Sequence, residues 1–250
     1  MTTDKGPKSA AVSVAAAAGT FRVGGMAKGA GMIEPHMATM LGFVTTDAAV
    51  AVPVLQRALR EAVGVTFNAI TIDGDTSTND TVFLLASGAS GVEIDETAYP
   101  AFVAALCEVC GSLARAIVRG GEGVTKLVAI TASGARSEPD AKRAAKTVAN
   151  SLLVKTAIHG GDPNWGRLLA AAGRAGVAFD VEHATVRVGP VVLFQDGVPF
   201  DDRAPDAAAY LAGADLEIDV DLGTGGTHSA TVWTCDLSAE YVAINADYRT

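Results

Sequence analysis

The chain has 250 residues and a formal net charge of −9, from 19 basic and 28 acidic residues. Hydrophobic residues make up 49%, charged residues 19% and aromatic residues only 6%. This composition excludes a disordered chain and predicts a core built mainly from Ala, Val, Leu and Ile. The acidic balance, without a densely basic window, argues against nucleic acid as a partner, and the length predicts one compact unit because single cores stop growing at about 250 to 300 residues.

The first half of the chain predicts strands followed by helices. Residues 10–33 alternate as two extended segments separated by Gly19-Thr20, and residues 39–48 predict another strand. A helix is expected from Pro53, because proline suits a first helical turn and apolar residues recur there with helical spacing. Two further strands, over residues 67–74 and 81–88, are expected on either side of a polar loop. A long helix that ends before Gly120 follows them.

The second half predicts a buried strand over residues 124–135 and a helix over residues 137–153, which starts with Ser137, Glu138 and Pro139. A Gly/Pro/Asn turn within residues 160–176 feeds a short helix. The remaining apolar stretches, which include residues 241–250, are predicted as strands joined by turns. Because strands and long helices interleave while hairpin spacings also occur, a layered α/β sandwich is favoured over a purely parallel sheet.

The cysteines and the hydropathy pattern point to a reducing compartment. Three cysteines make no disulfide framework, and Cys107 and Cys110 are expected to be small apolar residues on a buried helix. No run of about 18 strongly apolar residues is apparent, so no membrane span is expected. A cytoplasmic location fits best.

One acidic loop has the residue types of a cation site. Residues 72–80 contain Asp73, Asp75, Asn79 and Asp80 after an apolar stretch, but in an order that fits neither a calcium loop nor an aspartate-nucleophile phosphatase. A hydrogen-bonded turn is the prediction, and metal-dependent phosphoryl transfer through Asp73 and Asp75 stays an open alternative. The four histidines show no ligand spacing, so no metal site is expected.

Several stretches together resemble one known family. The segment "GGMAKGAGMIEPHMATMLGFVTTDA" is similar to the region around the self-cleavage site of the ornithine acetyltransferases, also called bifunctional glutamate N-acetyltransferases. The same family is resembled, in its order, along the rest of the chain by "MTTDKGPK", "ITIDGDTSTNDT", "GGEGVTKL", "NSLLVKTAIHGGDPNWGR" and "YVAINADYRT". Joint agreement over the whole length is far more specific than a single Ala-Thr pair.

The resemblance implies a layered αββα sandwich like that of N-terminal-nucleophile enzymes, and self-cleavage between Ala38 and Thr39 into residues 1–38 and 39–250. A threonine hydroxyl is a weak nucleophile, but an N-terminal threonine carries an α-amino group with a pKa of roughly 7.7 to 8.0 that can act as its base. Cleavage would therefore create the catalytic base.

The implied reaction transfers the acetyl group of N2-acetyl-L-ornithine to L-glutamate in arginine biosynthesis, through acetyl-Thr39. Carried over position by position, the substrate-binding residues are Thr2, Lys28, Thr39, Glu122, Asn245 and Thr250. We expect Lys28 to bind a carboxylate and Glu122 an ammonium group. No cofactor is expected, although acetyl-CoA can serve some members as a co-substrate, and the family assembles from two cleaved heterodimers as a heterotetramer.

One departure from the family pattern leaves alternatives open. "MTTD" is normally internal in relatives, so residues 1–250 are expected to form a single acetyltransferase unit that lacks the N-terminal portion and its oxyanion-hole donors. Such a chain would expose a strand edge or an apolar patch and associate. The alternatives are an N-terminal-nucleophile aminopeptidase or amidohydrolase, in which water replaces glutamate, and an inactive fragment that needs the missing half.

Overall fold

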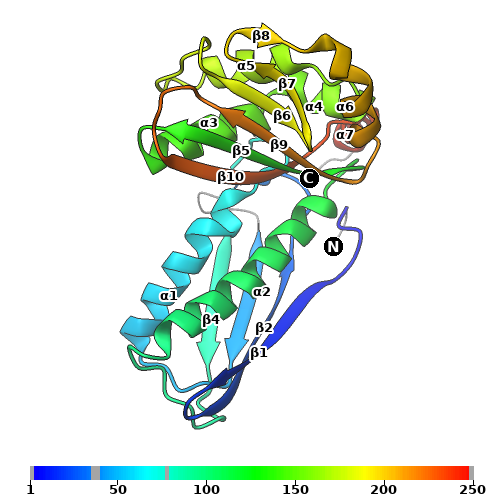
Figure 1. Cartoon of the computed structure of the whole chain (residues 1–250). Coiled ribbons are helices and arrows are strands. Elements are labelled where there is room, and N and C mark those ends of the chain that lie inside the picture. The colour runs from blue at the N-terminus through cyan, green and yellow to red at the C-terminus, as the bar shows by residue number, and fades with distance from the viewer. Residues whose placement is uncertain (1–2, 35–39, 77–78, 248–250) are drawn as a thin grey trace. The chain divides into compact units, whose positions relative to one another are not determined.

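A computed structural model of the chain describes residues 3–34, 40–76 and 79–247 (Figure 1). The chain folds into two compact units, Met1–Gly121 and Glu122–Thr250. The sequence predicted a single compact unit, whereas each of these two has a sheet and helices of its own. The chain length lies at the limit where one core stops growing, so either arrangement was open to it.

The first unit contains a four-stranded sheet with helices on one face (Figure 1). The strand order is β1-β2-β3-β4, with antiparallel pairing up to β3 and parallel pairing between β3 and β4. The elements are β1 (Lys8–Ala16), β2 (Gly19–Lys28), β3 (Leu41–Thr46), α1 (Val52–Val65), β4 (Thr81–Ala86) and α2 (Tyr99–Arg119). The two predicted extended segments, the third strand and the two helices are thereby confirmed.

The core of this unit lies between the sheet and α2. Helical spacing places one apolar face of α2 against β1 and β2, and the Phe102 ring lies 6.0 Å from that of Phe21 on β2. The opposite face of the sheet carries large apolar side chains that no described helix covers: Met26 (61% exposed), Phe43 (41%), Phe83 (47%) and Leu85 (53%). The rings of Phe43 and Phe83 stack with centroids 5.3 Å apart.

Within the described residues, α2 is long and apolar enough by composition to cross a membrane, with a mean hydropathy of 1.8 over 18 residues. This corrects the expectation that no such run exists: alanine, cysteine and valine keep the average high although charged residues occur along the helix. Just over half of that window, 56%, is buried, and the helix packs on its own sheet. These features are typical of a core helix in a globular unit.

The second unit contains a six-stranded mixed sheet in the order β10-β5-β9-β6-β7-β8. Its strands are β5 (Leu127–Ala135), β6 (Thr185–Val188), β7 (Val191–Gln195), β8 (Val198–Pro199), β9 (Asp215–Asp221) and β10 (His228–Cys235). Its helices are α3 (Glu138–Ala149), α4 (Leu152–Gly160), α5 (Trp165–Gly173), α6 (Ala204–Leu211) and α7 (Ala239–Asp247). Only β5 and β9 pair in parallel, and α3 packs on β5 and β10, so the α/β class is confirmed.

Local chemistry explains where the helices of this unit begin and end. The Ser137 side chain accepts a hydrogen bond from the amide of Asp140 at 3.3 Å, which confirms the predicted start of α3. The predicted helix over 137–153 is interrupted, because α3 ends at Ala149 and α4 begins at Leu152. Helix α6 was not predicted from the sequence, although Pro205 lies in its first turn.

Two predicted strands are wrong. Residues 67–74 form a short 3₁₀ helix, Phe67–Ala69, a single bridge residue, Ile70, and a bend, and their apolar alternation reflects the burial of Ile70 and Ile72. Residues 241–247 belong to α7, because the Ser238 hydroxyl accepts a hydrogen bond from the Tyr241 amide at 3.4 Å and so caps a helix there.

Candidate active site

The predicted site residues fall into three groups. Thr2, Ala38, Thr39 and Thr250 lie outside the described residues. Lys28 belongs to the first unit, and Glu122 and Asn245 belong to the second.

In the first unit, chain neighbours of three predicted positions meet. Lys28 is the exposed last residue of β2 and pairs in register with Leu41, two residues after Thr39 in the sequence. The next residue, Gly29, donates its amide hydrogen bond at 3.2 Å to Oδ2 of Asp4, which follows Thr2 by two residues. The structure thus joins the segments that carry Thr2 and Lys28 at the end of β2.

Asp4 is suited to bind the Gly29 amide as a charged carboxylate. Its side chain is 5% exposed, contacts the ammonium group of Lys8 and accepts the Gly6 amide. Burial alone would raise the pKa of Asp4, but the hydrogen bonds from Lys8, Gly29 and Gly6 outweigh burial and lower that pKa. Asp4 is therefore charged at neutral pH.

Met40, the residue after Thr39 in the sequence, directly precedes β3, an inner strand of the same sheet, and is held by hydrogen bonds. It is 2% exposed, its amide donates to the Asp80 carboxylate, and its carbonyl accepts the Thr81 amide at 2.9 Å. A cavity of about 460 Å³ lies beside it. The cavity is lined by Met40, Leu59, Arg60, Val63, Asn68, Asp80, Thr81 and Val82. Its size is within the range of small-molecule sites.

The acidic loop forms the predicted hydrogen-bonded turn. The carboxylate of Asp73 accepts amides from Met32 at 2.7 Å, Ile33 at 2.9 Å and Asp75 at 3.2 Å. These bonds tie the loop to the segment that follows β2. Among the described residues, no group of three or more His, Cys, Asp or Glu side chains could hold a metal ion.

In the second unit, the structure brings two predicted residues together. Nδ2 of Asn245, on α7, donates a 2.8 Å hydrogen bond to Oε2 of Glu122, and the same nitrogen donates to the Tyr241 carbonyl at 3.0 Å. Glu122 is 8% exposed. A shielded carboxylate oriented by a neutral amide is suited to bind an ammonium group.

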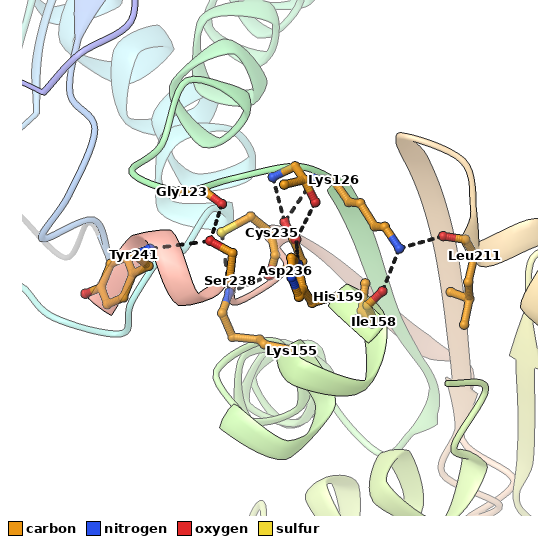
Figure 2. A network of polar contacts seen from close by, with 11 residues as sticks. Gly123, Lys126, Lys155, Ile158, His159, Leu211, Cys235, Asp236, Ser238 and Tyr241 are labelled. Carbon is orange, nitrogen blue, oxygen red and sulfur yellow. Dashed lines mark hydrogen bonds and ion pairs between the residues drawn. The ribbon is translucent and has the colours of Figure 1, made fainter. Parts of the chain in front are cut away.

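A buried carboxylate, Asp236, accepts several hydrogen bonds from the segment that follows Glu122, within the polar network of Figure 2. Asp236, whose side chain is fully buried, accepts the Thr125 amide at 2.9 Å, the Thr125 hydroxyl at 2.5 Å and the Lys126 amide at 2.9 Å. Its Oδ2 also lies 2.7 Å from Nδ1 of His159. Burial would raise the pKa of Asp236, but these four hydrogen bonds outweigh burial and hold that pKa below the ordinary 3.8.

A buried lysine supports the same segment from α4. Lys155 is 3% exposed, and its Nζ donates to Thr234 Oγ1 at 3.0 Å and to the Cys235 carbonyl at 2.5 Å. Sequence reasoning did not single out Lys155, His159 or Asp236. The first two lie within the family-like stretch 150–167, which was a usable signal, whereas nothing in the sequence marked Asp236.

These features define the class of protein: an α/β chain whose second unit holds a shielded carboxylate, Glu122, that is oriented by Asn245 and suited to an ammonium group. Comparison with known proteins places it more narrowly. The model of the ArgJ family matches residues 1–250. The chain belongs to this family.

Curated relatives are similar along the whole chain. It is 52% identical over 255 residues to the arginine biosynthesis bifunctional protein ArgJ of Chlorobium chlorochromatii, covering all of this chain and 58% of that protein. It is 47% identical over 260 residues to a glutamate N-acetyltransferase of Methanocaldococcus jannaschii, covering all of this chain and 64% of that protein. The chain thus spans about three fifths of the length of these relatives.

A solved structure confirms the fold. The crystal structure of arginine biosynthesis bifunctional protein ArgJ from Bacillus halodurans matches with a TM-score of 0.81 and 42% sequence identity. The match covers 84% of this chain and all of that chain. The predicted α/β fold of the ornithine acetyltransferase type is therefore correct.

Proposed function

We propose that this chain provides the acetyl-transfer site of a glutamate N-acetyltransferase, which moves the acetyl group of N2-acetyl-L-ornithine to L-glutamate in arginine biosynthesis. Family membership over the whole chain supports this activity. The observation that carries it to particular residues is the hydrogen bond between Glu122 and Asn245, two positions at which the family resemblance implies substrate binding.

Thr39 is the proposed nucleophile, released by cleavage of the Ala38-Thr39 bond. Its hydroxyl attacks the acetyl carbonyl and passes its proton to its own α-amino group, and the carbon–nitrogen bond to ornithine then breaks as the leaving amine takes up that proton. Glutamate attacks the resulting ester through its amine and regenerates the hydroxyl.

The remaining site residues are proposed from the charges that the substrates carry. Glu122, oriented by Asn245, takes an ammonium group, and Lys28 at the end of β2 takes a carboxylate. Thr2 and Thr250 are proposed as further contacts through their hydroxyls. No cofactor takes part in this cycle, and acetyl-CoA is an alternative acetyl donor.

Association is part of the proposal. The cleaved chains assemble as a heterotetramer, and the uncovered apolar face of the first sheet supports association of this chain. Its proposed location is the cytoplasm, although one relative, from Schizosaccharomyces japonicus, is named as mitochondrial.

The test is intact-mass and N-terminal analysis of the purified chain and of Thr39→Ala, followed by acetyl transfer from N-acetylornithine to glutamate with and without acetyl-CoA. We expect the wild type to split into fragments starting at Met1 and Thr39, the variant to stay whole, and acetylglutamate to form only with the wild type. Free acetate formed at the same rate without glutamate would identify a hydrolase instead. An uncut, inactive chain would mean that this polypeptide alone is not the enzyme.

A further inference from the structure

We propose that Asp236 is a positioning residue for substrate recognition: its buried carboxylate fastens the segment 122–126 to the start of α7, so that Glu122 and Asn245 form a preshaped site for an ammonium group. The ligand chemistry in this inference rests on the proposed function. The fastening itself rests only on contacts within the second unit.

The first step is the direct attachment. The Asp236 carboxylate accepts hydrogen bonds from the amide and the hydroxyl of Thr125 and from the amide of Lys126. These two residues lie three and four positions after Glu122. Asp236 lies just after β10, at the approach to α7. One carboxylate therefore joins the strand end before Asn245 to the chain that follows Glu122, over a sequence separation of 111 residues.

The second step is a close approach at Gly123, the residue directly after Glu122. The Ser238 hydroxyl donates to the Gly123 carbonyl at 2.7 Å and accepts the Tyr241 amide at 3.4 Å. Gly123 has a φ of +66°, and a Cβ atom there would lie 2.5 Å from the Tyr241 nitrogen. The first turn of α7 is thus packed directly on the residue after Glu122, with no room for a side chain between them.

The third step is the support of Asp236 itself. Nδ1 of His159 contacts the Asp236 carboxylate. Nζ of Lys155 donates a hydrogen bond to the Cys235 carbonyl, and the Lys155 carbonyl accepts one from the Leu237 amide at 3.3 Å. Helix α4 therefore fixes the residues before and after Asp236 (Figure 2). This gives the family-like stretch 150–167 a role, although none of its residues was predicted to touch substrate.

The consequence is preorganisation. A carboxylate and an amide from distant parts of the chain keep a 2.8 Å hydrogen bond only if both backbones are held in place. A site that is already shaped loses less conformational entropy when the ligand binds. Loss of the Asp236 attachment is expected to weaken recognition of the ammonium group rather than binding of every ligand.

The attachment is tested by hydrogen–deuterium exchange of the full chain. In Asp236→Asn, and in Thr125→Val, which leaves the carboxylate intact, we expect at least tenfold faster amide exchange over residues 122–126 and the start of α7. The control is Asp180→Asn, which removes the exposed carboxylate that lies 2.9 Å from Nδ1 of His183 in the same unit. Exchange that is no faster in Asp236→Asn than in this control would overturn the proposal.

The effect on recognition is tested by calorimetry with ornithine and with norvaline, which lacks the side-chain ammonium group. We expect Glu122→Gln and Asp236→Asn each to reduce the preference for ornithine about tenfold, and the double variant to lose no more than Glu122→Gln alone. Additive losses, or an unchanged preference in Asp236→Asn, would contradict action through Glu122. A wild type that binds ornithine selectively but transfers no acetyl group would contradict the proposed function and leave this inference standing.

Discussion

Nδ2 of Asn245 lies 2.8 Å from Oε2 of Glu122, although 123 positions separate the two residues in the chain. The helix that carries Asn245 was not expected, and it is the helix that brings the amide to the carboxylate. Substitutions of Asn245 therefore test whether this hydrogen bond matters for activity.

Asn245→Ala removes the donor, whereas Asn245→Asp places a second carboxylate next to Glu122. We expect kcat/KM for N-acetylornithine to fall about tenfold in the first variant, and further in the second because like charges repel at this distance. Steady-state kinetics with both variants would check the order. An Asn245→Asp enzyme as active as Asn245→Ala would argue against a carboxylate site.

Gly123→Ala tests the close approach of α7. Its φ of +66° strains any alanine, and the new Cβ would collide with Tyr241 and Ser238. Gly176 has a φ of +70° with no atom within 4 Å of its would-be Cβ, so Gly176→Ala measures the backbone strain alone. In urea titrations we expect a loss of about 1 kcal/mol for Gly176→Ala and at least twice that for Gly123→Ala. Equal losses would mean that α7 can move away without cost.

The acid sensitivity of the second unit follows from Asp236. Because the pKa of this carboxyl is lowered in the folded state, its stabilising contribution is present above pH about 4 and is lost as the pH falls through the folded-state pKa, below 3.8. Asp236→Asn should cost about 1 to 3 kcal/mol near pH 6, and the difference from wild type should shrink towards pH 3. The exposed Asp202→Asn is the control of equal charge change; a constant difference at every pH would rule out this origin.

The three cysteines should differ in reactivity. Burial raises the pKa of Cys107 and raises the pKa of Cys110 to about 12, and Cys235 is 1% exposed. Since thiolates react and buried thiols do not, a thiol reagent at pH 8 should slowly modify Cys107 alone in the folded chain and all three after unfolding. Peptide mapping and a Cys107→Ser variant would check this, and rapid labelling of Cys110 would contradict the packing of α2.

The uncovered face of the first sheet should drive association. Replacing Phe43 and Phe83 by serine removes the stacked, exposed pair, and we expect the dissociation constant for self-association to rise at least tenfold. Sedimentation velocity over a dilution series is the measurement. Leu152→Ser, at a side chain that is 66% exposed on α4, is the matched control. Unchanged association in the double variant would show that another surface is responsible.

The sequence determined local structure wherever side-chain pattern and backbone preference agree. The long helix that ends before Gly120 was predicted and is α2, with Phe102, Leu106 and Val109 on its buried face, and Ser137 with Pro139 predicted the start of α3. The ordered family-like stretches also pointed to Glu122 and Asn245 before any contact was known.

Tertiary structure decided what depends on distant partners. Ile70 and Ile72 alternate like strand residues, yet they lie outside the named strands, and the C-terminal apolar residues form α7 because Ser238 caps a helix there. Asp236 is one ordinary aspartate in the sequence, and its importance arises only when Thr125, Lys126 and His159 converge on it. The physical reason is that short-range preferences act between chain neighbours, whereas a buried charge is stabilised by whichever donors the whole fold brings within hydrogen-bonding distance.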